Sequence, residues 1–106
     1  GVQTDAACAA IQLVGNRLPI NSYGIDLQGS KHVVVGNHLS ANTNTDIRLR
    51  CTSSVVQANL CDSTGVATSI VESGVADYNV IAGNVTNGTV TVAGANSASN
   101  GNNVVY

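Results

Sequence analysis

Short apolar stretches alternate with polar turns along the whole chain and return in nearly the same order. The recurring phrases are QLVGN (12–16), VVVGN (33–37), VVQAN (55–59) and VIAGN (80–84), with a partial copy, VVY, at 104–106. Their Gly-Asn or Ala-Asn steps follow one another at spacings of 21, 22 and 25 residues. A phrase that returns at such a period indicates a repeat architecture, in which each copy completes the core of its neighbours.

One position in each phrase is always apolar and is therefore expected to face a core. It lies two residues before the Gly or Ala and is occupied by Leu13, Val34, Val56, Ile81 and, in the partial copy, Val105. The residue after it varies between apolar and polar types, as is typical of an outward position on a strand. The residue before it belongs to a second column, which consists of Gln12, Val33, Val55, Val80 and Val104. This column faces either a wide core or the surface, where it would form an apolar strip that contacts a partner.

A second strand is expected after each phrase, beyond a polar turn. These segments read YGIDLQG (23–29), TDIRLRC (45–51), TSIVESG (68–74) and GTVTVAG (88–94). Their aliphatic residues mostly alternate with polar ones, and a period of two predicts a β-strand. The Ala-rich stretch 5–14 is the one place where a short helix or an N-terminal cap is an alternative.

These strands predict an all-β fold, a right-handed parallel β-helix of four to five rungs with about 22 residues each. Residues 1–10 are expected to form a lead-in or a partial rung, and residues 11–106 the stacked repeats. At each bend the Gly or Ala permits a sharp turn, and the Asn that follows it can bond to the next rung. The proposed ladder of stacked side chains is Asn16, Asn37, Asn59 and Asn84.

The composition favours many small layers over one bulky core. The chain has 106 residues, with no Phe, Trp or Met, and 9% of its residues are charged. Its net charge of −2 and its scattered cations, Arg17, Lys31, Arg48 and Arg50, argue against a nucleic-acid or membrane-surface partner. No apolar run approaches the roughly 20 residues of a membrane-spanning helix. Because the chain has neither an initiating Met nor a signal sequence, we expect it to be a piece of a longer protein.

The three cysteines, Cys8, Cys51 and Cys61, form no CxxC motif and are odd in number. We expect them to be buried free thiols that act as small hydrophobic residues. A disulfide between Cys51 and Cys61 is the alternative.

Two pairs of segments resemble the repeats of the pectin-lyase-like superfamily of right-handed parallel β-helices. They are DYNVIAGNVTN (77–87) with GTVTVAG, and KHVVVGNHLS (31–40) with YGIDLQG, and the resemblance extends over residues 11–106. It implies the fold, whereas the superfamily includes polysaccharide lyases, hydrolases, epimerases and fibre segments without activity. Within the superfamily, repeats rich in Asn, Gly and Val look most like those of bacteriophage tailspikes and appendages. Such proteins are commonly homotrimers that bind, and often cleave, cell-surface polysaccharide.

Acidic residues provide the only candidates for catalysis. Because β-helix glycosidases place two carboxylic acids on either side of a glycosidic bond, Asp26 and Glu72 are weak catalytic candidates. Asp26 and Arg48 occupy the same outward position on adjacent rungs, where they form either a surface ion pair or part of a sugar-binding face. Glu72 replaces an inward apolar residue. Either the rung is shifted so that Val71 points inward, or Glu72 marks a site.

The remaining polar residues carry weaker signals. Asp46 and Asp62 lie beside turns, where solvated carboxylates that cap local amides are expected. His32 and His38 lack a third metal ligand, so they are interpreted as surface histidines, and neither a metal nor a cofactor is expected. The weak carbohydrate-binding candidates are Arg48, Tyr23 and Tyr78.

Together these observations favour a structural, trimer-forming segment of a phage tailspike or appendage, located in the virion or outside the cell. Its expected partners are further copies of itself and cell-surface polysaccharide, with no nucleic acid and no membrane. One alternative is a piece of a β-helix enzyme that degrades polysaccharide, and another is a bacterial surface or adhesin repeat. Fold resemblance alone does not choose among them.

Overall fold

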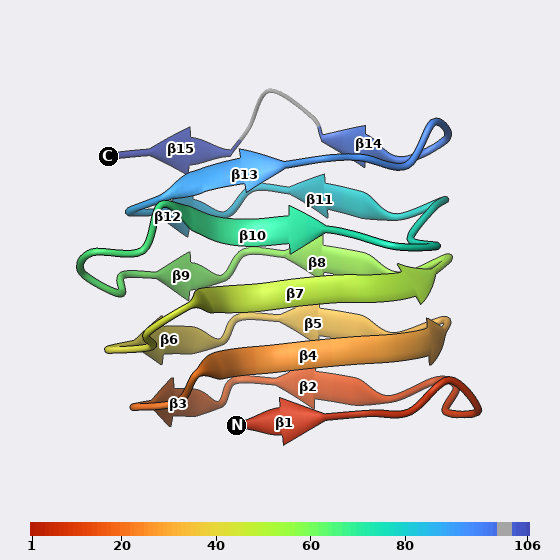
Figure 1. The fold of residues 1–106 in the computed structure, drawn as a ribbon, viewed down its shortest axis with the longest axis horizontal. Coiled ribbons are helices and arrows are strands. Elements are labelled where there is room, and N and C mark those ends of the chain that lie inside the picture. The colour runs from red at the N-terminus through yellow and green to blue at the C-terminus, as the bar shows by residue number, and fades with distance from the viewer. Residues whose placement is uncertain (100–102) are drawn as a thin grey trace.

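The computed structural model describes residues 1–99 and 103–106, and in this part of the chain it contains strands and no helix. Three parallel sheets of five strands each enclose one core, which confirms the predicted all-β parallel solenoid. Successive turns are stacked like the rungs of a ladder, and the body measures 30 × 27 × 23 Å (Figure 1).

The chain passes through the three sheets in the same order in every turn. Sheet A contains β1 (Val2–Gln3), β4 (Tyr23–Ser30), β7 (Thr45–Thr52), β10 (Thr68–Glu72) and β13 (Thr89–Thr91). Sheet B contains β2 (Gln12–Val14), β5 (Val33–Val35), β8 (Val55–Gln57), β11 (Val80–Ala82) and β14 (Ala98–Ser99). Sheet C contains β3 (Arg17–Pro19), β6 (His38–Ser40), β9 (Leu60–Cys61), β12 (Val85–Thr86) and β15 (Val104–Val105).

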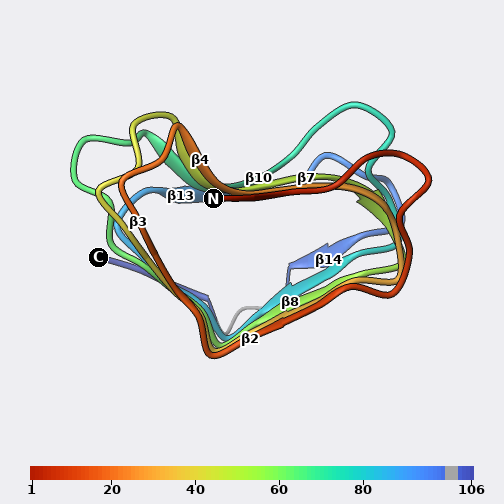
Figure 2. The ribbon, with the colours of Figure 1, turned by 90° about the horizontal axis from the view of Figure 1, so that it is seen from below.

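The coil is right-handed, as expected from the sequence. In Figure 1 the chain crosses sheet A from left to right at the front, returns through sheets B and C behind it, and rises by one strand per turn. Seen along the axis in Figure 2, the three sheets enclose a triangular outline in which sheets B and C meet at a narrow corner. Loops rise beyond both ends of sheet A, so the outer face of this sheet lies between two rows of turns.

The interior is filled by columns of aliphatic side chains. Sheet A contributes the fully buried Ile25, Leu27, Ile47, Leu49 and Ile70. Sheets B and C contribute the fully buried Val34, Val56, Ile81, Leu39 and Cys61. Each side chain packs on its equivalent one turn above or below, so a narrow core without aromatic rings still removes apolar surface from water in every layer.

The last turn differs from the sequence-based alignment. Val104 and Val105 pair with Val85 and Thr86 in sheet C, and not with the valines of sheet B. The sheet B strand of this turn is Ala98–Ser99, which pairs with Val80 and Ile81. The partial phrase VVY was therefore assigned to the wrong strand, because the alignment followed the valines and Ala98–Ser99 has only small side chains.

The narrow corner between sheets B and C is built from the Gly/Ala-Asn steps. The residue before each Asn has a positive φ, between 55° and 69°, at Gly15, Gly36, Ala58 and Gly83. From Asn37 upward, each Asn accepts at Oδ1 from the backbone N–H and the Nδ2 of the Asn one turn below. The Nδ2···Oδ1 distances in this column, Asn16, Asn37, Asn59, Asn84 and Asn103, are 3.0–3.1 Å.

Asn103 is a member of this column that the sequence analysis missed. It precedes Val104 as Asn84 precedes Val85, and this shared Asn-Val step was the signal in the sequence. From Asn37 upward, Nδ2 also donates to a strand carbonyl, as in the 3.0 Å bond from Asn59 to Val34. Each inner member therefore has its polar atoms satisfied although it is almost completely buried.

The other two corners also contain a residue with positive φ before an inward residue, but the residue types differ. Between sheets A and B, residues with positive φ precede inward residues, as in Lys31-His32, Ser53-Ser54 and Tyr78-Asn79. The backbone N–H of one member donates to the side chain of the next, as from His32 to Ser54 Oγ at 3.0 Å and from Ser54 to Asn79 Oδ1 at 2.9 Å. Between sheets C and A, the corresponding pairs are Ile20-Asn21 and Ala41-Asn42.

Glu72 points into the interior, which contradicts the interpretation that the rung is shifted. It pairs with Leu49 and is 2% exposed, whereas Val71 pairs with the outward Arg48. Four donors satisfy its carboxylate: Asn79 Nδ2 (2.7 Å), Ser97 Oγ (2.6 Å), and the backbone N–H groups of Ala93 and Gly94 (both 3.1 Å). A buried carboxylate is tolerated here because its hydrogen bonds replace the lost water.

Asp46 is also buried, at 0% exposure, and is therefore not the solvated turn residue that its sequence position suggested. Its Oδ1 accepts from Asn42 Nδ2 at 2.7 Å and from Ser63 Oγ, whereas Oδ2 has no hydrogen-bond partner among the described residues. Burial raises the pKa of this carboxyl group above its ordinary value, because the charged form loses its hydration. Asp62 is only partly buried and interacts with His38.

Candidate functional site

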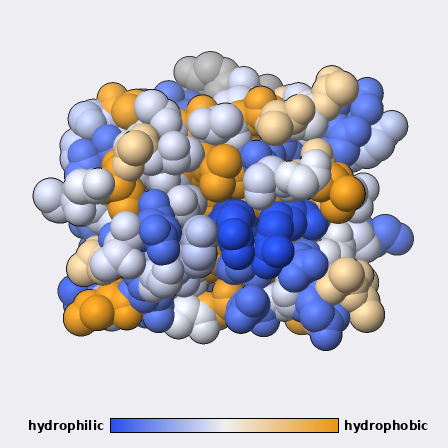
Figure 3. All heavy atoms as spheres, in the orientation of Figure 1, coloured by the Kyte–Doolittle hydropathy of each residue, from blue (hydrophilic) through white to orange (hydrophobic). Residues whose placement is uncertain are grey.

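A cluster of charged and polar side chains on the outer face of sheet A forms the candidate site. Strand pairing places Gln3, Asp26 and Arg48 in one outward column, and Gln28 and Arg50 in the next. Figure 3 shows strongly hydrophilic side chains gathered near the middle of this face. The two arginines belong to one strand, β7, and project on the same side because they are two residues apart.

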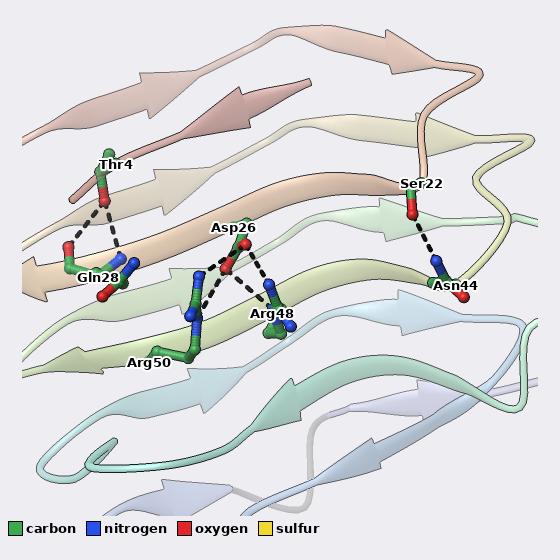
Figure 4. Close-up of polar contacts among 7 residues, drawn as sticks. All are labelled: Thr4, Ser22, Asp26, Gln28, Asn44, Arg48 and Arg50. Carbon is green, nitrogen blue, oxygen red and sulfur yellow. Dashed lines mark hydrogen bonds and ion pairs between the residues drawn. The ribbon is translucent and has the colours of Figure 1, made fainter. Parts of the chain in front are cut away.

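Asp26 is the centre of the cluster, because its carboxylate accepts from both guanidinium groups (Figure 4). Arg48 donates from Nε to Oδ1 at 3.1 Å and from Nη2 to Oδ2 at 2.5 Å. Arg50 donates from Nε to Oδ1 at 3.2 Å and from Nη2 to Oδ2 at 3.0 Å. The arginines cover the carboxylate, so Asp26 is only 4% exposed although it points away from the core.

The charges of this cluster do not cancel. Burial raises the pKa of Asp26, but the hydrogen bonds and positive charges of Arg48 and Arg50 lower this pKa by more, so that it lies below its ordinary value. The carboxylate is therefore ionised at neutral pH, and it raises the pKa of Arg48 in return. Two guanidinium ions share one carboxylate, which leaves the cluster with a net positive charge.

Tyr23 supports the arginines from the side. Its ring lies under Arg48, with 4.0 Å between the guanidinium carbon and the ring centroid, and a cation–π contact of this kind orients the guanidinium plane. A depression of about 390 Å³ opens next to this contact. Its lining includes Gln3, Asn21, Ser22, Tyr23, Asp26 and Arg48.

The structure brings some candidate binding residues together and separates another. Arg48 and Tyr23 are in contact, whereas Tyr78 lies at the corner between sheets A and B with 62% exposure. Arg50 is a site residue that the sequence analysis did not single out. The signal was present, since Arg48 and Arg50 alternate with the inward Leu49 and must share the face of Asp26.

The two catalytic candidates do not form a pair. Asp26 points outward from β4 and is fully engaged by two arginines, whereas Glu72 points inward from β10 and is enclosed in the core. Because they lie on opposite faces of one sheet, they cannot flank a single glycosidic bond.

Histidines and cysteines lie away from this face. His32 is not a surface residue: it is 1% exposed, and its ring bonds to the Gln28 carbonyl at 2.7 Å and to the Ile11 N–H at 3.2 Å. His38 is partly exposed and contacts Asp62 at 2.9 Å. Within residues 1–99 and 103–106, no three His, Cys, Asp or Glu side chains are arranged to hold a metal ion.

The thiols are free, and those of Cys51 and Cys61 are buried, as expected, whereas Cys8 is partly exposed. Burial raises the pKa of the Cys51 and Cys61 thiols, so both act as apolar core groups. None of the described residues belongs to a helix that could span a membrane.

The outer face of sheet B is largely apolar, whereas the outward column of sheet C begins with Arg17 and His38 and becomes apolar only in the later turns. On sheet B the outward column contains Gln12, Val33, Val55, Val80 and Ala98. On sheet C the last three turns present Leu60, Val85 and Val104, which are 37%, 39% and 56% exposed. The apolar strip expected from the sequence therefore ends with Ala98 on sheet B, because Val104 belongs to sheet C.

No protein-family model matches the chain, and comparisons with curated proteins and with solved structures give no significant match.

Proposed function

We propose that this chain is a structural, homotrimer-forming segment of a phage tailspike or related appendage that contributes to attachment to host cell-surface glycans. The observation that carries the proposal is the outer face of sheet B. Its described strands carry no charged side chain, and valines occupy its outward column in three consecutive turns. A face of this kind is typical of a surface that contacts a partner.

The distribution of charge supports this orientation of the segment. Arg48 and Arg50 lie on the outer face of sheet A, and Glu72 and Asp46 are enclosed in the interior. Three copies that turn their sheet B faces toward a common axis would bury the valines and leave the charged sheet A faces in water. The resemblance to the pectin-lyase-like superfamily and to tailspikes supports the same arrangement by analogy only.

The mass of the protein in solution tests the trimer. We expect a trimer by light scattering at tens of micromolar protein, as is usual for such measurements, and dissociation when Val80→Asp places a charge on the sheet B face. Thr91→Asp is the matched control, because Thr91 is exposed on sheet A. A monomer at every concentration, or equal dissociation of both variants, would contradict the proposal.

A further inference from the structure

We propose that Arg48 and Arg50 form a binding site for an acidic group of a glycan, such as a uronic-acid carboxylate. This inference rests on the glycan attachment proposed above and specifies which class of glycan the sheet A face recognises. It begins from the hydrogen bonds of the two guanidinium groups. Each uses Nε and Nη2 for Asp26, and none of the described residues accepts a hydrogen bond from Nη1 of either arginine.

Both arginine side chains are partly exposed and held in place. The side chains of Arg48 and Arg50 are 26% and 30% exposed, so part of each remains in contact with water. Asp26 fixes both guanidinium planes through two bonds each (Figure 4). The Tyr23 ring packs against the plane of Arg48. Because both guanidinium groups are already ordered, a ligand does not have to immobilise two flexible side chains. Less conformational entropy is therefore lost on binding.

The electrostatics favour an anion over a neutral sugar. The two cations share a single carboxylate, and the remaining positive charge is not balanced by the other buried acids, because Asp46 and Glu72 are turned into the core. A second carboxylate that bridges the Nη1 groups would complete the charge balance. Charge-assisted hydrogen bonds from guanidinium to carboxylate are about twice as strong as those between neutral groups.

The surroundings fit a sugar ring that carries the acid. The depression of about 390 Å³ adjoins the cluster and is lined by amide, hydroxyl and aromatic groups, including Asn21, Ser22 and Tyr23. Amide and hydroxyl groups can exchange hydrogen bonds with sugar hydroxyls, and an aromatic ring can pack on a sugar face. The combination of an anion contact and a polar depression points to an acidic saccharide.

Binding of a defined probe tests the site. The probe is a hyaluronan hexasaccharide, and its carboxyl-reduced form is the matched neutral ligand. We expect the wild-type protein to bind the acidic form at least about tenfold more tightly in an NMR titration at low salt, and the difference to shrink as salt screens the contact. We expect Arg50→Gln to weaken binding of the acidic form about tenfold, whereas Arg50→Lys, which keeps the charge without the planar fork, weakens it less.

Arg17→Gln is the control variant, because it removes the same charge from an exposed position on sheet C. Equal losses in Arg17→Gln and Arg50→Gln would show attraction to overall charge and overturn the site. Equal binding of the acidic and the carboxyl-reduced ligand would contradict recognition of an acidic group but would be consistent with the proposed attachment to glycans. Binding of neither form overturns this site, and the solution mass then tests the trimer separately. Thermal unfolding of each variant shows whether a loss of binding reflects a loss of fold.

Discussion

Two corners flank sheet A, and each holds one buried carboxylate in a different state. At the corner with sheet B, Glu72 accepts four hydrogen bonds, and two of the donors, Asn79 and Ser97, belong to the polar column of that corner. At the corner with sheet C, Asp46 accepts from Asn42 and Ser63 on one oxygen, while its other oxygen has no described partner.

The difference lies in how completely the two carboxyl groups are hydrogen-bonded, which sets the cost of burying them. The Glu72 carboxylate accepts from the backbone of residues 93 and 94 in the next turn, and Asn79, which also donates to it, donates to the Cys51 carbonyl of the preceding turn. Only Oδ1 of Asp46 accepts hydrogen bonds at its corner. Its Oδ2 has lost contact with water without gaining a donor among the described residues, so its burial costs free energy. The comparison leads to three predictions, beginning with the largest expected effect.

Removal of the paired carboxylate should cause the largest loss of stability. We expect Glu72→Ala to lower the free energy of unfolding by about 3–5 kcal/mol, because it leaves several buried donors without an acceptor. Glu72→Gln should cost less, since one oxygen remains. Urea unfolding at a fixed protein concentration measures both. A loss no greater for Glu72→Ala than for Asp46→Ala would remove the basis of the comparison.

Neutralisation of the half-paired carboxylate should be stabilising. Because the pKa of Asp46 is raised in the folded state, folding takes up a proton between the unfolded and folded pKa values, and stability falls as pH rises through that window. We therefore expect Asp46→Asn to raise the free energy of unfolding by about 1 kcal/mol at pH 7. This gain should disappear below about pH 4, where Asp46 is protonated in both states. A gain that is independent of pH would refute the explanation.

The smallest effect concerns the backbone that both corners share. Ala41 has φ 54° at the corner with sheet C, and Ser53 has φ 57° at the corner with sheet B. Replacement of either residue with Gly should relieve left-handed strain of about 1 kcal/mol, reduced by the entropy that Gly adds to the unfolded chain. We expect a small increase in melting temperature of similar size at both corners. Thr91→Gly, at an extended position, should lower the melting temperature instead.

Much of the fold could be predicted because the residue types at each repeat position specify the local backbone structure. Branched residues in period two predict strands, and strands too short to bury their own apolar face must stack on their copies. The Gly/Ala-Asn step at residues 36–37 identified one corner, since only a few residue types adopt positive φ readily. The corners next to sheet A escaped detection because Lys31 and Ser53 at one corner, and Ala41 at the other, take the same backbone angles without the usual residue types.

The candidate site was predictable only in outline. The strand register alone predicted that Asp26 lies beside Arg48. The burial of the Asp26 carboxylate also depends on Arg50, whose guanidinium group donates two further hydrogen bonds to it. The alignment of the final turn failed at Ala98–Ser99, because a strand of small residues carries no apolar signal.

The sequence by itself determined the strands, their stacking and the inward columns, because these follow from side-chain periodicity and from the inability of one rung to bury its own apolar face. Only the tertiary structure decided the state of the carboxylates. Asp26, Asp46 and Glu72 are chemically similar, yet one is clamped by arginines, one is half paired and one is fully satisfied. Most of their partners, such as Arg48, Ser63 and Ser97, come from the next turn of the chain, and hydrogen bonds between turns depend on distances that a single sequence does not record.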